Sequence, residues 1–400
     1  MNQKPKKTII YITRDIERTL GIEPNDHYFI ISNDSKYGCA MQKKWPNNVW
    51  LIKKDARKNG ALDTYDLLFL PEVQKKIAER KASVLVFQNT LRIERLVKKK
   101  GWKLLNPSAD LAKIVEEKIS QVKWLGSDAN LLPAHKISQV KNVKFGGKKF
   151  VLQFNHSHTG QGTYIIDNQT KLKELQKKFS DRECRLSDFI DGPVFTVNIV
   201  VTGKKIFVGN PSYQITGLTP FTDLPFSTIG NDFALPHDQK YKKVYAKTSD
   251  IALRVGIKLK TSGWKGLFGI DVIYDEKTEK TYLLEINARQ PASAVFESKL
   301  QKKTDPRGVS IFEAHISALL DEPIKEKLTV VSSGSQIVKR VTKKVFGVDI
   351  ASLRKKSFDV IEYENTIHNR ELFRIQSAEG IMENHGKLNK NGNFITSCIR

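Results

Sequence analysis

Short apolar runs alternate with amphipathic helical patterns through the first hundred residues. The apolar runs have the length of buried strands: TIIYI at 8–12, YFIIS at 28–32, LLFL at 67–70 and SVLVF at 83–87. The helical pattern LRIERLVKKK follows the last run, and Gly101 can end that helix. The alternation predicts a parallel sheet with crossover helices, a Rossmann-like unit. This unit contains neither GxGxxG nor GxxxxGK followed by Ser or Thr, so it lacks a glycine-rich phosphate loop.

The pattern changes after residue 107. Ser108 can cap a helix that we expect over about 109–124. Apolar alternation around turn residues then predicts antiparallel strands within 146–166, 185–217 and 263–293. A further helix is expected from about 238 to 258, and the last seventy residues add strands around SQIVKR and FDVIEY.

Composition narrows the class of protein. The chain has 400 residues, of which 40% are apolar and 28% charged, and this ordinary usage excludes wholesale disorder. Its three separated cysteines form neither a disulfide framework nor a spaced metal site, and no run approaches the roughly twenty apolar residues of a membrane helix. We therefore expect a cytoplasmic protein without a membrane partner. The net charge of +24 would suit a polyanion, but the lysines are scattered, so we do not favour nucleic acid as the partner.

The segment GWKGLFGIDVIYDEKTEKTYLLEINARQPAS, at 263–293, places polar side chains within two apolar strands. Glu285 and Asn287 are two residues apart and point to the same side of their strand, and Asp271 can face them across the hairpin. Two carboxylates and an amide oxygen are hard ligands that suit Mg²⁺ when it bridges nucleotide phosphates. Arg289 would bring a guanidinium to the same side. The alternative from spacing alone is an internal ion pair between Arg289 and Glu285.

This segment resembles the metal-binding core of ATP-grasp ligases, a family that includes D-alanine–D-alanine ligase, biotin carboxylase and carbamoyl phosphate synthetase. In that family an acid on one strand and E-x-N on its neighbour hold Mg²⁺ against the ATP phosphates. The resemblance implies that Asp271, Glu285 and Asn287 hold Mg²⁺ or Mn²⁺. It also implies that Arg289 binds the anionic substrate or intermediate and, on a weaker match, that Lys265 in GWKG is catalytic.

Two further stretches resemble the same family. DFIDGPVFTVNIV, at 188–200, is similar to the stretch that passes the adenine. The implied adenine edge is Ser187, Asp188, Phe189 and Ile190, with Ile190 giving the N–H. NHSHTGQGT, at 155–163, is similar to the glycine-rich loop that folds over the phosphates. The ATP contacts implied there are His158, Thr159, Gly160, Gly162 and Thr163. Alone, such a loop is more often only a turn, and His156 and His158 can equally be solvated.

The chain departs from the family pattern at two positions. Relatives usually carry a Lys on the strand before the glycine loop, where this chain has Gln153, and an acid after the G-P of the adenine stretch, where it has Val194. Gln153 can hydrogen-bond a phosphate or the adenine, but it adds no positive charge. Lys148 or Lys149 can compensate in part.

The remaining candidates are two lysines and two polar residues. We assign the family's other phosphate lysine to Lys118, in VEEKISQVKWL, with Lys113 as the alternative, and either can equally be a surface residue. Both are expected on the helix after Ser108. Gln214 and Asn231 lie between the adenine stretch and the metal hairpin and are candidate substrate contacts, with ordinary turn chemistry as the alternative.

The resemblance implies an ATP-grasp fold of class α/β (α+β). A Rossmann-like pre-ATP-grasp domain would cover 1–107, the ATP-grasp domain 108–328 and a C-terminal β-rich α+β extension 329–400. The glycine-loop lid would span about 130–186 and the metal-binding core about 190–328. The implied activity is that of an ATP- and Mg²⁺-dependent ligase that joins a small-molecule or peptide carboxylate to an amine through an acyl phosphate.

Two other functions stay open. Gln153 and Val194 motivate a catalytically inactive or nucleotide-sensing ATP-grasp protein. A bicarbonate-dependent, carboxylase-like enzyme is the nearest rival among the ligases, although no biotin-attachment domain is visible in the chain. We also leave open whether the chain forms a homodimer.

Overall fold

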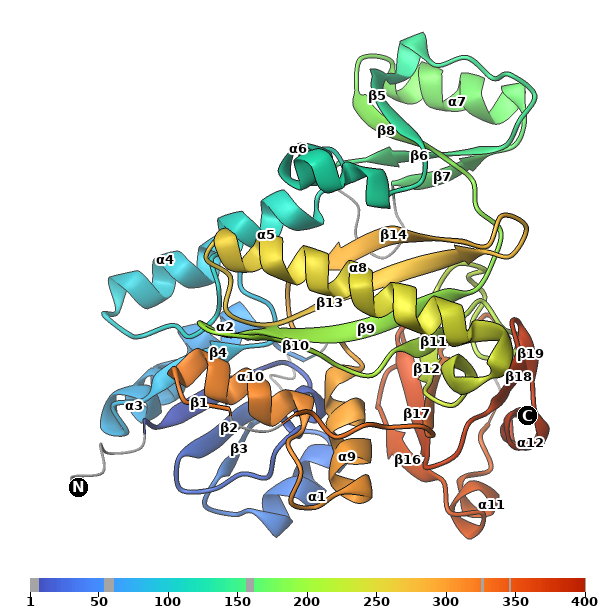
Figure 1. The fold of residues 1–400 in the computed structure, drawn as a ribbon. Helices are drawn as coiled ribbons and strands as arrows, with labels where there is room; N and C mark the ends of the chain where they lie inside the picture. Colours follow the sequence, from blue (N-terminus) through green and yellow to red (C-terminus); the bar gives the residue numbers. More distant parts are fainter. Residues whose placement is uncertain (1–6, 54–60, 156–161, 325–326, 345–346, 400) are drawn as a thin grey trace.

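The computed structural model of the protein describes residues 7–53, 61–155, 162–324, 327–344 and 347–399. Figure 1 shows an N-terminal unit in blue, a small sheet in green at the top, and a long central sheet that the red C-terminal strands extend. The mixed α/β class predicted above is confirmed. Within the described ranges, none of the helices combines the length and the apolar character that a membrane span requires.

The N-terminal unit is a parallel sheet, as the alternating runs predicted. Its strand order is β3-β2-β1-β4, and every neighbouring pair is parallel. Its elements are β1 (Ile9–Ile12), β2 (Tyr28–Asn33), α1 (Lys36–Lys44), β3 (Val49–Ile52), α2 (Thr64–Phe69), α3 (Pro71–Glu79), β4 (Ser83–Val86) and α4 (Leu91–Lys99). Gly101, at φ +66°, follows the end of α4, where glycine was expected to stop the helix.

The prediction of a strand at 67–70 was wrong, because this segment falls largely in α2. Asp63 caps that helix, and its side chain accepts a hydrogen bond from the backbone N–H of Asp66. Leu67 and Leu68 are buried on the side of α2 that faces the sheet. A four-residue apolar run fits a buried strand or a buried helical turn equally well, so only the cap distinguishes them.

The single helix expected after Ser108 is broken into two. Ser108 does cap the first of them. The two helices are α5 (Ala109–Glu116) and α6 (Ser120–Leu125). Between them the N–H of Ile119 donates to the Asn155 side-chain oxygen at 2.9 Å, a tertiary contact in place of a helical one. Lys118 therefore lies in a bend, where its side chain is not confined to a helix surface.

The small sheet has four antiparallel strands in the order β5-β8-β6-β7. Its elements are β5 (His135–Gln139), β6 (Phe150–Phe154), β7 (Thr163–Ile166), α7 (Gln169–Phe179) and β8 (Glu183–Asp188). Leu152, Leu172 and Cys184 are buried between the strands and α7, so the small sheet has a core of its own.

The central sheet has the order β14-β13-β9-β11-β12-β15-β17-β16, with β10 paired to β9. Its strands are β9 (Val194–Val201), β10 (Ile206–Val208), β11 (Ser212–Thr216), β12 (Thr228–Asp232), β13 (Gly266–Asp275), β14 (Lys280–Asn287), β15 (Ser335–Arg340), β16 (Asp359–Glu362) and β17 (Glu371–Ser377). The hairpin expected within 263–293 is β13–β14, and the strands expected at SQIVKR and FDVIEY are β15 and β16.

Helices cover both faces of the central sheet. Val197 and Ile199 of β9 share a core with α8 (Lys242–Thr261), whereas Val200 shares one with α10 (Ile311–Leu320). This alternation is the two-residue period of a strand that is buried on both sides. The remaining helices and strands are α9 (Ala294–Thr304), α11 (Ile350–Lys355), β18 (Met382–Asn384), β19 (Lys387–Leu388) and α12 (Lys390–Ser397). Short 3₁₀ helices lie at Ile16–Thr19, Gly126–Leu131, Val140–Asn142, Leu235–His237 and Gln239–Tyr241.

The central sheet crosses the residue where we expected the C-terminal extension to begin. Strand β15 lies beyond residue 328, yet it pairs with β12 through Gly230 and Ile337. The N-terminal unit is tied to the same sheet. The Tyr11 hydroxyl donates to the Gln290 side chain at 2.7 Å, and that side chain donates back to the Arg18 carbonyl oxygen at 2.7 Å. The C-terminal strands therefore extend the central sheet beyond β12, and the N-terminal unit contacts the segment that follows β14.

Candidate active site

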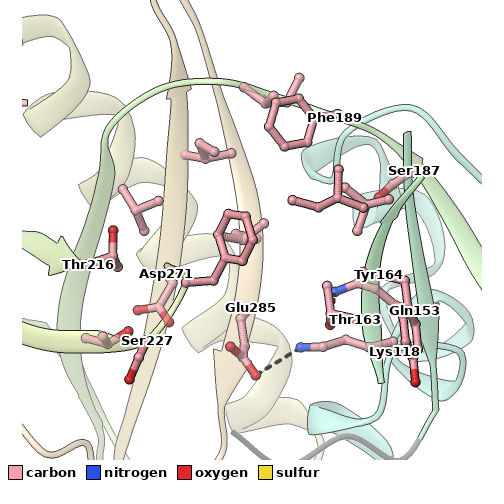
Figure 2. A pocket seen from close by; sticks show the side chains of 18 of the residues that line it. Lys118, Gln153, Thr163, Tyr164, Ser187, Phe189, Thr216, Ser227, Asp271 and Glu285 are labelled. Carbon is pink, nitrogen blue, oxygen red and sulfur yellow. Dashed lines mark hydrogen bonds and ion pairs between the residues drawn. The ribbon is translucent and has the colours of Figure 1, made fainter. Parts of the chain in front are cut away.

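A cavity of about 1580 Å³ lies between the small sheet and the central sheet. Figure 2 shows the carboxylates of Asp271 and Glu285 on the side of the central sheet and Gln153, Thr163 and Ser187 on the opposite side. Most of the residues singled out in the sequence line it: Lys118, Gln153, Thr163, Ser187, Asp188, Phe189, Ile190, Gln214, Asn231, Asp271, Glu285, Asn287 and Arg289.

Asp271 is fixed by its neighbours on both sides. In the hairpin it is paired with Glu285, and on the other side with Thr196 of β9. Its carboxylate accepts a hydrogen bond from the Thr196 hydroxyl at 2.6 Å and one from the Asn287 amide at 3.2 Å. Its side chain is buried, with no cation within 4.0 Å among the described residues. Burial and the nearby Glu285 carboxylate raise the pKa of Asp271 to about 6.

Glu285 reaches across the cavity to Lys118. The Lys118 ammonium lies 3.0 Å from the Glu285 carboxylate, and Figure 2 shows this contact spanning the two sides. Lys118 is only 5% exposed, whereas the Glu285 side chain is 44% exposed toward the cavity. Burial alone would raise the pKa of Glu285, but Lys118, with Arg289 and Arg185, outweighs it and lowers that pKa.

Arg289 does not make the internal ion pair that spacing left open. Its guanidinium pairs with Glu116 at the end of α5, at 2.6 Å, and Glu285 is paired with Lys118 instead. Arg289 also lines the cavity and is about one-third exposed. Its backbone N–H donates to the Asn287 carbonyl oxygen at 2.8 Å, which turns the chain at the end of β14.

The small-sheet side of the cavity carries a cation that sequence reasoning missed. Gln153 on β6 is opposite Arg185 on β8, and its side-chain oxygen accepts from two guanidinium nitrogens at 3.2 and 2.8 Å. The Gln153 amide in turn donates to the Thr163 hydroxyl at 3.3 Å. Arg185 is two residues before Ser187 on the same strand, so the i, i+2 rule applied to RLSD could have found it. Neither Lys148 nor Lys149, the expected compensating lysines, lines the cavity.

The chain crosses between the two sheets through residues 189–193. Phe189 and Ile190 follow the end of β8 and line the cavity, and Figure 2 shows Phe189 on this crossing segment. Lys149 lies over the Phe189 ring at 3.7 Å. A Cβ at Gly192 would lie 1.9 Å from the Tyr274 carbonyl oxygen, so only glycine lets the crossing segment lie so close to β13.

The far end of the cavity, where residues of β11, β12 and β15 line it, is polar. Gln214 and Asn231 are paired on β11 and β12, so they lie on strands rather than in the turns that we gave as the alternative. Arg340 of β15 and Asn369 also line this end and were not found from the sequence. The Nε of Arg340 and the Oδ1 of Asn369 are buried and have no hydrogen-bond partner in the described part of the chain.

Two predicted residues lie elsewhere. Lys113 is on the surface of α5, 3.9 Å from Glu117, and Lys265 pairs with Asp321 at 2.5 Å near the end of α10. Neither lines the cavity, so the structure does not support their assignment to the site. The break after α5 separates Lys113 from Lys118, and the start of β13 directs Lys265 toward α10. Of the glycine-rich loop, His156, His158, Thr159 and Gly160 lie outside the described residues, and Gly162, at φ +103°, precedes β7.

The donors on the hairpin fit a hard divalent cation. Where side chains are described, no three His, Cys, Asp or Glu residues gather as a metal cluster, and this set offers two carboxylates and one amide instead. Asp271 is a buried carboxylate held by neutral donors, which is the environment that a cation would complete. Oxygen donors of this kind suit Mg²⁺ that keeps further positions for water and phosphate.

The fold and the cavity define the class of domain. Residues 115–293 match the family described as the ATP-grasp domain, so the chain carries an ATP-grasp domain at the cavity, as the sequence motifs indicated. Solved structures match nearly the whole chain, so the likeness in fold extends beyond residues 115–293.

The proteins that are similar to this chain include one curated relative and two solved structures, as follows. A curated relative from Niallia circulans, "[Butirosin acyl-carrier protein]--L-glutamate ligase", is 24% identical over 161 residues, which are 37% of this chain and 34% of that protein. The chain thus matches about a third of the length of that relative. The structure of N5-carboxyaminoimidazole synthetase from Staphylococcus aureus, complexed with ADP, has a TM-score of 0.63 at 12% identity and covers 98% of this chain and 95% of its own. That of an L-amino acid ligase from Bacillus licheniformis has a TM-score of 0.61 at 12% identity, with 94% of each chain covered.

Proposed function

We propose that this protein is an ATP-dependent ligase of the cytoplasm that activates a substrate carboxylate as an acyl phosphate and joins it to an amine. The observation that carries the proposal is the convergence of the oxygen donors Asp271, Glu285 and Asn287 with the buried Lys118 at one cavity of an ATP-grasp domain. Oxygen donors and a cation at one place suit a metal–nucleotide complex better than a lone metal or a lone anion.

Asp271, Glu285 and Asn287 would hold Mg²⁺ or Mn²⁺, which supplies charge neutralisation at the phosphates when bound. The chain's own residues then have separate tasks. Ser187 to Ile190, at the end of β8 and the start of the crossing segment, would receive the adenine. Lys118, already aimed at Glu285, would turn its ammonium to a phosphate oxygen once that carboxylate takes the metal.

The proposed reaction has two steps. A carboxylate oxygen of the substrate attacks the γ-phosphorus, and ADP leaves. The amine nitrogen then attacks the acyl carbon, phosphate leaves with the electrons of the C–O bond, and the nitrogen loses a proton to solvent. Lys118 and Arg289 would stabilise the charge on the transferring group, so catalysis rests on positioning and electrostatics rather than on a protein nucleophile.

The far end of the cavity supports an anionic or peptide-like substrate. Arg340 brings a guanidinium whose Nε has no hydrogen-bond partner among the described residues, and Asn369, Gln214 and Asn231 bring amide groups. The names of the relatives point in the same direction, because two of them are ligases of amino acids. A carboxylate on an amino acid, a short peptide or a carrier-bound acyl chain is therefore the substrate class to test first.

The test is an assay of ADP release. Purified protein with Mg²⁺-ATP is given a pool of N-acetylated amino acids and dipeptides as carboxylates and a pool of amines, singly and together. ADP and phosphate are expected only when a carboxylate is present, and amide product only when both pools are present. Absence of nucleotide binding at millimolar Mg²⁺-ATP would contradict the proposal. Tight binding without turnover in any pool would instead favour the nucleotide-sensing alternative.

A separate arm of the assay addresses the carboxylase alternative. Replacement of the carboxylate pool by bicarbonate should leave ADP release at background if the protein is a carboxylate–amine ligase. Bicarbonate-dependent turnover would move the activity to the carboxylase class. Light scattering on the same preparation determines whether the chain is a homodimer.

A further inference from the structure

Arg185 is a buried cation with no counter-ion in the part of the chain that the structure describes. Its side chain is 3% exposed, and among the described residues no carboxylate lies within 4.0 Å of its guanidinium. The nearest interacting acid, Glu285, is already bonded to Lys118. An unpaired charge in a protein interior is costly, so a side chain of this kind is retained where an anion completes it.

Neutral side chains hold Arg185 in place. Gln153 accepts from its Nε and Nη2, and Gln121 of α6 accepts from its Nη1 at 3.1 Å. Gln121 is itself fully buried and is anchored by its amide, which donates to the Val115 carbonyl oxygen at 2.8 Å. Two amide oxygens orient a guanidinium without neutralising it, and its full charge is left for a ligand.

The guanidinium borders the cavity. Arg185 lines it together with Ser187, and the two side chains point to the same side of β8 because they are two residues apart. Burial lowers the pKa of Arg185 to about 10, so the side chain stays charged at neutral pH. Arg185 lies about 6–7 Å from Ser187 along β8, because the two are two residues apart. A ligand whose base contacts the crossing segment would therefore bring its phosphates past Arg185.

We propose that Arg185 binds a phosphate oxygen of the nucleotide, with Gln121 and Gln153 as its positioning residues. The charge that Gln153 cannot supply from β6 is thus supplied from β8, the neighbouring strand. This inference rests on the proposed function, because it takes the ligand of the cavity to be a nucleotide.

The experiment measures the binding of adenosine, AMP, ADP and Mg²⁺-ATP to the full-length protein by calorimetry. Arg185→Met should weaken the phosphorylated ligands about 10- to 100-fold, the effect of losing a charge-assisted hydrogen bond, and leave adenosine unchanged. The first ligand in the series to show the loss identifies the phosphate contacted. A matched control is Arg182→Met, because Arg182 directly precedes β8 of the same small sheet but stacks on Phe154 outside the cavity. That control should bind all four ligands as the wild type does.

A charge exchange guards against a variant that is merely misfolded. Gln153 and Arg185 are opposite one another and in contact, so Gln153→Lys combined with Arg185→Met moves the cation by one strand. The double variant should regain most of the lost affinity for the phosphorylated ligands. Unchanged nucleotide affinity in Arg185→Met, or equal weakening of adenosine and AMP, would overturn the inference. If the wild type binds no nucleotide at all, the proposed function itself fails. The wild type and the Arg185 variants would then show the same lack of nucleotide binding.

Discussion

Each side of the cavity holds a buried charged group that is bonded to neutral side chains, and the two groups have opposite signs. On the central sheet, the Asp271 carboxylate is held by a hydroxyl and an amide. On the small sheet, the Arg185 guanidinium is held by two amide oxygens. Neither group has an ion-pair partner among the described residues, and Lys118 and Glu285 make the pair that bridges the gap. The comparison shows a site divided into an acidic half and a basic half, which a ligand carrying both a cation and phosphates would join.

The largest effect is expected when the acidic half is broken. Glu285→Gln removes the carboxylate that faces Lys118 and would lower kcat/KM for ATP-dependent turnover by about 10³-fold or more, since it removes several kcal/mol of electrostatic stabilisation. Steady-state ADP release measures the loss. Glu276→Gln, at the exposed turn of the same hairpin, is the matched control and should behave as the wild type. Retained turnover in Glu285→Gln would mean that the hairpin acids are not part of the site.

A smaller effect, on the KM for ATP, is expected when the Lys118–Glu285 pair that bridges the cavity is broken. Lys118→Met should raise the KM for ATP about 10- to 100-fold, because one charge-assisted contact is lost while the metal ligands stay. Lys123→Met on the exposed surface of α6 provides the comparison. If both variants have the same KM, the Lys118–Glu285 contact is structural, and the division into two halves does not extend to the ligand.

The orientation of Asp271 gives a third, more modest prediction. Thr196→Val removes the 2.6 Å hydrogen bond to Asp271 and should raise the Mg²⁺ concentration needed for half-maximal activity about tenfold, as is usual for partners of a metal ligand. Thr196→Ser keeps the hydroxyl and should restore the wild-type value. A metal requirement that is equal in both variants would show that Thr196 only fills space.

The smallest predicted effect lies outside the cavity and concerns stability. His315 of α10 accepts a hydrogen bond from the Leu267 N–H, and burial lowers its pKa to about 3. The unfolded chain takes up this proton near pH 6.5, whereas the folded chain does not, so stability falls as the pH drops below 6.5. Urea unfolding at pH 7.5 and 5.5 should show about 1.4 kcal/mol of this loss in the wild type.

That loss should be absent from His315→Gln, whose amide oxygen can still accept from Leu267. His27→Gln, at an exposed histidine, should keep it. An equal pH dependence in all three proteins would mean that His315 is protonated in the folded state. This control separates the effect of pH on folding from its effect on the site. It thereby sharpens the comparison between the two halves of the cavity.

The sequence predicted most of the acidic half and little of the basic half. Glu285 and Asn287 stood out because the period of a strand fixes the side on which neighbours two apart must lie. Arg185 obeys the same rule, yet its importance depends on which strand lies opposite, and the pairing of β6 with β8 is a long-range contact. Lys118 was expected on a helix but lies between α5 and α6, because the hydrogen bond between Ile119 and Asn155 interrupts the helix.

The prediction of the fold from apolar runs failed at two short segments. The strand wrongly expected at 67–70 and the unnoticed β3 are both four-residue apolar runs, and such runs carry no period to read. Arg340 and Asn369 could not be assigned, because no local pattern brings them to the end of the cavity that is lined by Gln214 and Asn231, over a hundred positions earlier.

The pairing of β15 with β12 bears on how the protein can be dissected. A fragment ending at residue 328 would lose the neighbour of β12 and present a bare row of amide and carbonyl groups along that strand. Such a fragment would be prone to self-association through this exposed edge, and it would also lack the Arg340 side of the cavity. Truncation mapping is therefore better started from the small sheet, whose strands hydrogen-bond only to one another among those described.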